Sequence, residues 1–255
     1  MRYVTFAFLI ISTMFIAGCS SEQNTDETTL PVAAASSLSG TLSELKKAFE
    51  SEHRDITLTL NYEASGKLSQ QIRSGAPVDV FLTSDPKWMD RLAQEDAIVA
   101  DTRIDFAQNS LVFVSSRNKS ISASQLSDLP NMEVEQIAIG SPDSVSAGKY
   151  AKQAMTASGI WDNLEDRLIY TNNAQQTLTY IESGRAEFGI VCASDLTQSD
   201  LIKEIFPVDK ALHEPIQYQA AVTSTSSTME ASKEFNQFLK TDKAQSILRE
   251  NGFMD

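Results

Sequence analysis

The sequence predicts an α/β protein of two lobes, each a mostly parallel sheet flanked by helices, joined by crossover hinge strands. Short β-type runs alternate with amphipathic helical stretches through most of the chain. The alternation occurs twice over comparable lengths, without an internal sequence repeat. We expect residues 30–108 plus 216–255 to form lobe I and residues 109–215 to form lobe II. The chain would change lobes near Gln108 and again over residues 213–218.

The first half of the chain contains three successive strand–helix units. The predicted strands are apolar or alternating, and the helices carry apolar residues three or four positions apart. The strands lie at 32–35, 56–62 and 78–82, and the helices are marked by Leu38, Leu42, Leu45 and Phe49, by Leu68 and Ile72, and by Trp88, Met89 and Leu92. This order predicts parallel pairing, because each helix carries the chain back across the sheet.

The second half shows the same alternation. We expect strands at 111–114, 137–139, 168–170, 188–191 and 216–222, and helices around 150–155, 178–181, 235–239 and 247–248, ending at Gly252. Open α/β sheets bind ligands at the carboxyl ends of their strands. A ligand is therefore expected between the lobes.

The N-terminus carries a predicted export signal. Arg2 precedes an apolar run over residues 4–16, which is too short for a convincing membrane span. The run ends in IAGC, which resembles the bacterial lipobox, where the signal is cut before a cysteine that is then lipidated. We expect residues 1–18 to be a lipoprotein signal peptide, Cys19 to carry the lipid and residues 19–29 to be a flexible tether. The protein would then lie in the periplasm or at the cell surface, anchored to a bacterial membrane.

The composition argues against nucleic-acid ligands and against common enzyme classes. The chain has 34 acidic and 21 basic residues, a net charge of −13, whereas nucleic-acid binders need lysine and arginine to replace counterions. The acid excess by itself suggests a cationic ligand. The two histidines lack zinc-site spacing, and no HExxH, CxxC, GxxxxGK[ST] or GxSxG occurs. We expect a monomeric protein that is not an enzyme and has no cofactor.

Four predicted strand-to-helix turns consist of small neutral residues. They are Ala35-Ser36-Ser37-Leu38, Ala64-Ser65-Gly66, Ser146-Ala147-Gly148 and Asn172-Asn173-Ala174. Any one of them is explained as an ordinary helix cap. Four, distributed over both lobes, predict a shared cradle of N–H groups and hydroxyls for a deprotonated oxyanion. The turns therefore predict an anionic ligand, not the cationic ligand that the net charge suggests. Local dipoles in the cleft would attract the anion despite the acidic surface.

Five segments resemble a known family. They are VAAASSL from Val32, EASGKLSQQIRSGAPVDVFLTSDPKWMD from Glu63, NSLVFV from Asn109, GSPDSVSAGKYAKQA from Gly140 and FGIVCASD from Phe188. Together they resemble the molybdate-binding proteins of bacterial molybdate ABC transporters, which have the type II periplasmic binding protein fold. The resemblance runs from about residue 30 to 253, and the second segment is its most specific part.

The resemblance implies a set of ligand contacts. Hydroxyl contacts fall on Ser37 and Ser65, and backbone donors on Ala147 and, through a looser match, Ala174. Molybdate would be contacted through these four residues. Cys192 stands where the family commonly has a tyrosine, and a thiol is a poorer and shorter donor than a phenol. The choice among molybdate, tungstate and smaller oxyanions stays open at this position.

The function implied is that of an extracytoplasmic solute-binding lipoprotein. It would capture molybdate or tungstate in the interlobe cleft and deliver it to the membrane permease of an ABC transporter. Alternatives within binding proteins are sulfate, a phosphonate or an Fe(III)–anion complex, the last requiring tyrosines, histidines or carboxylates in the cleft. An extracellular hydrolase using Ser37 or Ser65 needs a base beside the serine, and a nucleophilic Cys192 needs a partner such as His213. A structural lipoprotein would bind no ligand.

Overall fold

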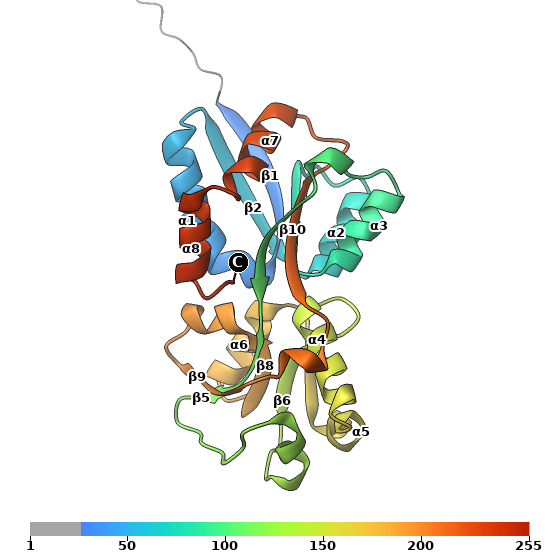
Figure 1. The fold of residues 1–255 in the computed structure, drawn as a ribbon, viewed down its shortest axis with the longest axis vertical. Coiled ribbons are helices and arrows are strands. Elements are labelled where there is room, and N and C mark those ends of the chain that lie inside the picture. The colour runs from blue at the N-terminus through green and yellow to red at the C-terminus, as the bar shows by residue number, and fades with distance from the viewer. Residues whose placement is uncertain (1–26, 255) are drawn as a thin grey trace, which may run out of the picture.

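The computed structural model describes residues 27–254 as two α/β lobes arranged along the long axis of the molecule (Figure 1). Lobe I contains β1(Thr28–Ala35), η1(Ser36–Leu38), α1(Ser39–Glu52), β2(Ile56–Glu63), α2(Ser65–Arg73), β3(Val80–Thr83), α3(Pro86–Gln94), β4(Ile104–Asn109), β10(Ile216–Val222), α7(Met229–Phe238) and α8(Asp242–Glu250). Lobe II contains β5(Leu111–Ser116), β6(Ile137–Gly140), α4(Ser146–Ala157), α5(Trp161–Leu164), β7(Leu168–Thr171), α6(Ala174–Glu182), β8(Phe188–Cys192) and β9(Ile202–Pro207). The predicted two-lobe α/β fold is confirmed.

Each lobe has a five-stranded sheet, and both sheets are mixed. The strand orders are β2-β1-β3-β10-β4 and β7-β6-β8-β5-β9. In lobe I, β1 pairs in parallel with β2 and β3, but β10 is antiparallel to β3 and β4. In lobe II, β6 pairs in parallel with β7 and β8, but β5 is antiparallel to β8 and β9. The prediction of mostly parallel sheets is therefore confirmed for strand direction within residues 27–254, with β10 in lobe I and β5 in lobe II running against the other strands of their sheets.

Two strand connections join the lobes, and they explain the antiparallel pairs. Figure 1 shows β4 running from lobe I toward β5 of lobe II, and β10 returning from lobe II into lobe I. A chain that leaves a sheet along one strand and returns along its neighbour must pair antiparallel there. β4 and β9 are absent from the predicted elements because their sequences, IDFAQN and IKEIFP, alternate only partly between apolar and polar residues.

The first strand begins earlier than predicted. β1 starts at Thr28, where the Thr28 N–H donates to the Asp55 carbonyl over 2.7 Å and the residue pairs with Ile56. Threonine favours strands, and the backbone ladder continues into this polar stretch. The last two residues of the predicted tether, 28–29, are thus part of the sheet. The predictions for residues 1–26, including the lipid at Cys19, lie outside the described residues.

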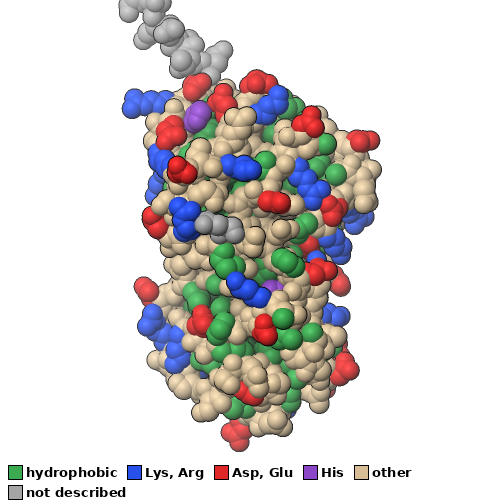
Figure 2. All heavy atoms as spheres, in the orientation of Figure 1, with side chains coloured by type: hydrophobic (Ala, Val, Ile, Leu, Met, Phe, Trp, Pro, Cys, Tyr) green, Lys and Arg blue, Asp and Glu red, His purple; other side chains and the backbone are tan. Residues whose placement is uncertain are grey.

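The sheets are covered by helices on both faces. Along β1, Val32 and Ala34 face the cluster that includes residues of α1, α7 and α8, whereas Ala33 between them faces the cluster formed with α2 and α3. This is the two-residue alternation of a strand buried on both sides. Within residues 27–254 no helix is long and apolar enough to cross a membrane. In Figure 2 acidic and basic side chains are interspersed over the visible face of both lobes.

Candidate functional site

Four helix N-termini lie where the two lobes face each other. Lobe I contributes η1, which leads into α1, and α2, while lobe II contributes α4 and α6. A cavity of about 900 Å³ opens between the lobes, lined in part by Ala64 and Gly66 of lobe I and by Ser144, Asn172 and Asn173 of lobe II. Two of the four predicted turns therefore contribute residues to the lining of this cavity, and Ser144, which also lines it, lies two positions before a third turn.

Two hydrogen bonds join turns of opposite lobes. The Ala174 N–H donates to Ser36 Oγ over 3.0 Å, and the Gly66 N–H donates to the Ser144 carbonyl over 3.1 Å. Both donors come from the first turn of a helix, where an N–H has no acceptor within its own helix. The first contact places the fourth turn, η1, beside the others. It also means that the Ala174 N–H, a predicted ligand donor, has a serine oxygen as its acceptor in this structure.

Ser37 of lobe I and Cys192 of lobe II meet at a third residue, Tyr218. The Ser37 hydroxyl lies 2.8 Å from the Tyr218 hydroxyl, and Tyr218 donates to Cys192 Sγ over 3.9 Å. Asn109 Nδ2 lies 3.5 Å from the same phenol oxygen. All four side chains are buried. Two of the residues predicted from the sequence are thus brought together by a tyrosine of β10.

Tyr218 is the site residue that sequence reasoning missed. It lies inside the run IQYQAAV, which the sequence identifies only as a strand, and at the end of the segment predicted to be a hinge. The sequence did contain one clue to it: position 192 is a cysteine where the resembling family commonly has a tyrosine. A tyrosine from another element could supply the missing hydroxyl. A two-residue strand period shows which side Tyr218 faces in β10, but not which residues lie opposite it.

The other two predicted contacts are also buried at helix N-termini. Ser65 Oγ lies 3.4 Å from Ser84 Oγ and accepts from the Ser84 N–H at 3.4 Å, both long distances that leave the hydroxyl weakly held. Ala147 is the second residue of α4, and the first hydrogen bond of that helix runs from Lys149 N to the Val145 carbonyl. The Ala147 N–H therefore precedes the helical ladder and is free of an intrahelical acceptor.

Close packing of two glycines holds the start of α4 against β6. A Cβ placed on Gly148 would lie 1.8 Å from the Gly140 carbonyl oxygen, which is far inside van der Waals contact. Only glycine permits this approach between the helix and the strand end. The position of the Ala147 N–H thus depends on the glycine at position 148, which lets the helix start lie against Gly140.

Burial favours the protonated forms of the ionisable groups near Tyr218. It raises the pKa of the Cys192 thiol and of the Tyr218 phenol well above their usual values, so both are neutral donors at pH 7. Burial also raises the pKa of Asp195 to about 7, although the Cys192 N–H donates to its carboxylate over 3.0 Å and favours the charged form. A protonated buried thiol is a weak nucleophile. Within residues 27–254 no group of three or more His, Cys, Asp or Glu is placed to hold a metal ion.

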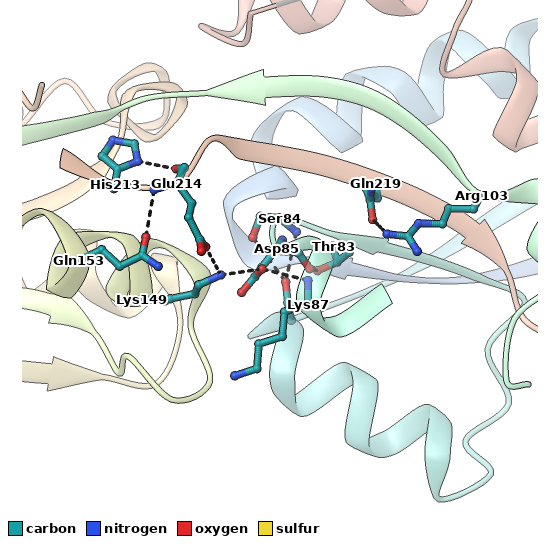
Figure 3. A network of polar contacts seen from close by, with 11 residues as sticks. Thr83, Ser84, Asp85, Lys87, Arg103, Lys149, Gln153, His213, Glu214 and Gln219 are labelled. Carbon is teal, nitrogen blue, oxygen red and sulfur yellow. Dashed lines mark hydrogen bonds and ion pairs between the residues drawn. The ribbon is translucent and has the colours of Figure 1, made fainter. Parts of the chain in front are cut away.

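An ion-paired network joins the lobes beside the cleft (Figure 3). Lys149 of α4 lies 3.1 Å from the Asp85 carboxylate of lobe I and 2.9 Å from Glu214, which precedes β10. Asp85 also caps α3 by accepting from the Lys87 N–H at 3.1 Å. Burial disfavours the Lys149 charge, but Glu214 and Asp85 outweigh it and raise the lysine pKa. The same ammonium lowers the pKa of Glu214.

The fold and this cleft define a two-lobe binding protein, and comparison with known proteins identifies its family. A family model described as bacterial extracellular solute-binding protein matches residues 30–254. The chain belongs to this family. The family is one of solute-binding proteins and not an enzyme class, which agrees with the expectation that the chain is not an enzyme.

Individual relatives cover nearly the whole chain. A Bacillus subtilis (strain 168) protein that bears the name "Putative ABC transporter substrate-binding lipoprotein YvgL" is 30% identical over 99% of this chain and 98% of its own length. The Escherichia coli (strain K12) molybdate-binding protein ModA is 30% identical over 89% of this chain and 90% of its own. The solved Azotobacter vinelandii periplasmic molybdate-binding protein superposes with a TM-score of 0.81 at 25% identity, covering 89% of this chain and 99% of that one. The chain is thus a substrate-binding protein of an ABC transporter, outside the cytoplasm.

Proposed function

We propose that this protein captures molybdate or tungstate and delivers it to its transporter permease. The observation that carries the proposal is the convergence of uncharged donors from both lobes, seen where Ser37 and Cys192 both contact Tyr218. Such donors suit a deprotonated tetrahedral anion, because its oxygens only accept hydrogen bonds. The site then needs no acceptor for a proton carried by the ligand. The molybdate-binding names of the Escherichia coli and Azotobacter vinelandii relatives support this ligand class.

The proposed ligand contacts are the hydroxyls of Ser37 and Ser65 and the N–H groups of Ala147 and Ala174, next to Cys192. The Ala174 N–H would exchange its Ser36 acceptor for a ligand oxygen, and a charged acceptor makes the stronger hydrogen bond. Donors from both lobes can converge on one anion only when the lobes are together. Binding would therefore shift the population toward the closed form that the permease recognises.

We place the hinge of this closure at the two lobe connections. One lies near Gln108, close to the end of β4, and the other spans residues 213–218 at the start of β10. These are the segments that continue directly from one sheet into the other. Lobe I would then comprise residues 30–108 plus 216–255, together with the two earlier strand residues, and lobe II residues 109–215.

Isothermal titration calorimetry with the purified protein tests the ligand class. Molybdate and tungstate are expected to bind with one site per chain, and sulfate, phosphate and a simple phosphonate to bind weakly, because a smaller or substituted tetrahedron does not reach all donors. Saturable binding of sulfate or the phosphonate alone would move the assignment to that ligand. A protein that responds to neither molybdate nor tungstate would contradict the proposal.

We further propose that Cys19 carries a lipid that holds the mature protein, as a monomer, at a bacterial membrane. The IAGC motif and the lipoprotein name of the YvgL relative support this. Expression of the wild type and Cys19→Ser in a bacterium supplied with labelled palmitate tests it. The wild type should carry label and sediment with membranes, whereas C19S should do neither. Equal labelling of the two would contradict the anchor at Cys19.

A further inference from the structure

A buried hydroxyl at the start of α4 has no hydrogen-bond partner in the part of the chain that the structure describes. Ser146 is the first residue of the helix and only 4% exposed, and its Oγ makes no hydrogen bond with any group of residues 27–254. Buried hydroxyls are nearly always paired, because an unpaired one loses its hydration without replacement. An unpaired hydroxyl beside Ala147, a predicted ligand contact, indicates a partner that binds there.

The position of Ser146 on its helix directs it toward lobe I. Lys149 and Tyr150 follow three and four positions later, so the three residues share one face of α4. Lys149 reaches across to Asp85 of lobe I at 3.1 Å, and Tyr150 lines the same cavity as Asp85 between the lobes. Figure 3 shows Lys149 extending from its helix to Asp85. The face that carries Ser146 is therefore the one that α4 presents to the opposite lobe.

The first turn of α4 already offers backbone donors at this place. The N–H groups of Ser146 and Ala147 precede the first hydrogen bond of the helix, from Lys149 N to the Val145 carbonyl. The hydroxyl would add a movable donor to these fixed ones. The Cys192 side chain of lobe II is a buried thiol, which is a weaker hydrogen-bond donor than a hydroxyl.

We propose that Ser146 Oγ is a direct ligand of the oxyanion, donating its hydrogen bond from lobe II beside the Ala147 N–H. This assignment rests on the proposed oxyanion-binding function. Ser146 would be a further ligand contact, in addition to those inferred at Ser37, Ser65, Ala147 and Ala174. The hydroxyl gives lobe II a side-chain donor opposite the serine hydroxyls of lobe I.

Calorimetry of Ser146→Ala with molybdate and with tungstate tests the assignment. The dissociation constant should rise tenfold or more for both anions, as expected for loss of a hydrogen bond to a charged group. The melting temperature without ligand should not fall, because the hydroxyl has no hydrogen-bond partner among residues 27–254 to lose. Ser232→Ala is the matched control: Ser232 is a buried serine in the first turns of α7, bonded to the Thr228 carbonyl at 2.8 Å. S232A should bind both anions like the wild type.

The outcomes separate this inference from the function on which it rests. If the wild type binds molybdate or tungstate and S146A binds it within twofold, Ser146 is not a ligand and the proposed function stands. If S146A loses affinity only together with a lowered melting temperature of the unliganded protein, the hydroxyl has a structural role and the assignment is wrong. If the wild type binds neither anion, both the function and the assignment fail.

Discussion

Replacing Lys149 with methionine should weaken oxyanion binding by opening the lobes. Lys149 is the cation that lobe II extends to Asp85 of lobe I, whose side chain is only 2% exposed. Methionine keeps most of the aliphatic stem and removes the charge. The contact joins the lobes, so its loss acts on the equilibrium between open and closed forms. The apparent affinity falls as the binding-competent population falls.

The size of the effect follows from the geometry. Opposite unit charges 3.1 Å apart attract by about 5 kcal/mol at an effective dielectric constant of about 20. Desolvation of the two groups offsets most of this attraction, whereas a fully exposed pair would contribute at most about 1 kcal/mol. For this partly exposed lysine we expect a net loss of about 1–2 kcal/mol, which corresponds to about a 5- to 30-fold rise in the dissociation constant.

The assay is calorimetric titration of molybdate into matched variants. Lys152→Met is the control, because Lys152 lies on the same helix but contacts only the Trp161 ring of its own lobe, 4.8 Å from the ring centroid, among its described interactions. Asp85→Asn separates closure from simple attraction of the anion by the Lys149 charge, since asparagine still caps α3. Closure predicts that D85N weakens binding, whereas attraction predicts that D85N strengthens it. Equal affinities of K149M and K152M, or tighter binding by D85N, would refute the closure argument.

Three further changes test other parts of the site. Tyr218→Phe should lower the free energy of unfolding by about 1–3 kcal/mol in urea titrations, because buried Ser37 loses its 2.8 Å partner; an unchanged midpoint would argue against that bond. Burial raises the pKa of Asp195 to about 7 in the native state, so between about pH 4 and pH 7 the native state holds a proton that the unfolded state has lost. The free energy of unfolding should therefore fall as the pH rises through this range. Urea titrations at pH 5 and pH 8 should show this fall in the wild type and a smaller one in Asp195→Asn; parallel behaviour would count against the raised pKa. Gly148→Ala should cost at least about 2 kcal/mol and weaken anion binding, since its Cβ would overlap the Gly140 carbonyl; normal stability and affinity would show that the helix start can shift freely.

Most helices and the central strands were predictable, because the spacing of apolar residues along the chain shows which side of a helix or strand is buried. β2, with its alternating ITLTLNYE, and α1, with Leu42, Leu45 and Phe49 on one face, lie where their patterns place them. β4 was not predicted, because a polar strand is held by pairing with β10 and not by its own pattern. The antiparallel direction of β10 was equally inaccessible, since it follows from the path between lobes.

The candidate site divides in the same way. The turns at Ser37, Ser65 and Ala147 were visible because helix starts have a local signature of small polar residues. Tyr218 was not, since it lies 181 positions from Ser37 and joins it only through the packing of two lobes. The cysteine at position 192, where the resembling family commonly has a tyrosine, indicated that a hydroxyl donor was missing there. No sequence rule identifies Tyr218 as the residue whose hydroxyl lies near Cys192.

By itself the sequence determined the alternation of strands and helices, the chemistry of four helix starts and the neutral character of the predicted cradle. These are set by steric preferences and burial within a few residues. Only the tertiary structure decided that Ser36 accepts from Ala174, that Lys149 pairs with Asp85 and that the buried Ser146 hydroxyl has no hydrogen-bond partner within residues 27–254. Contacts between distant residues depend on how the lobes pack together, and that packing is a property of the whole chain.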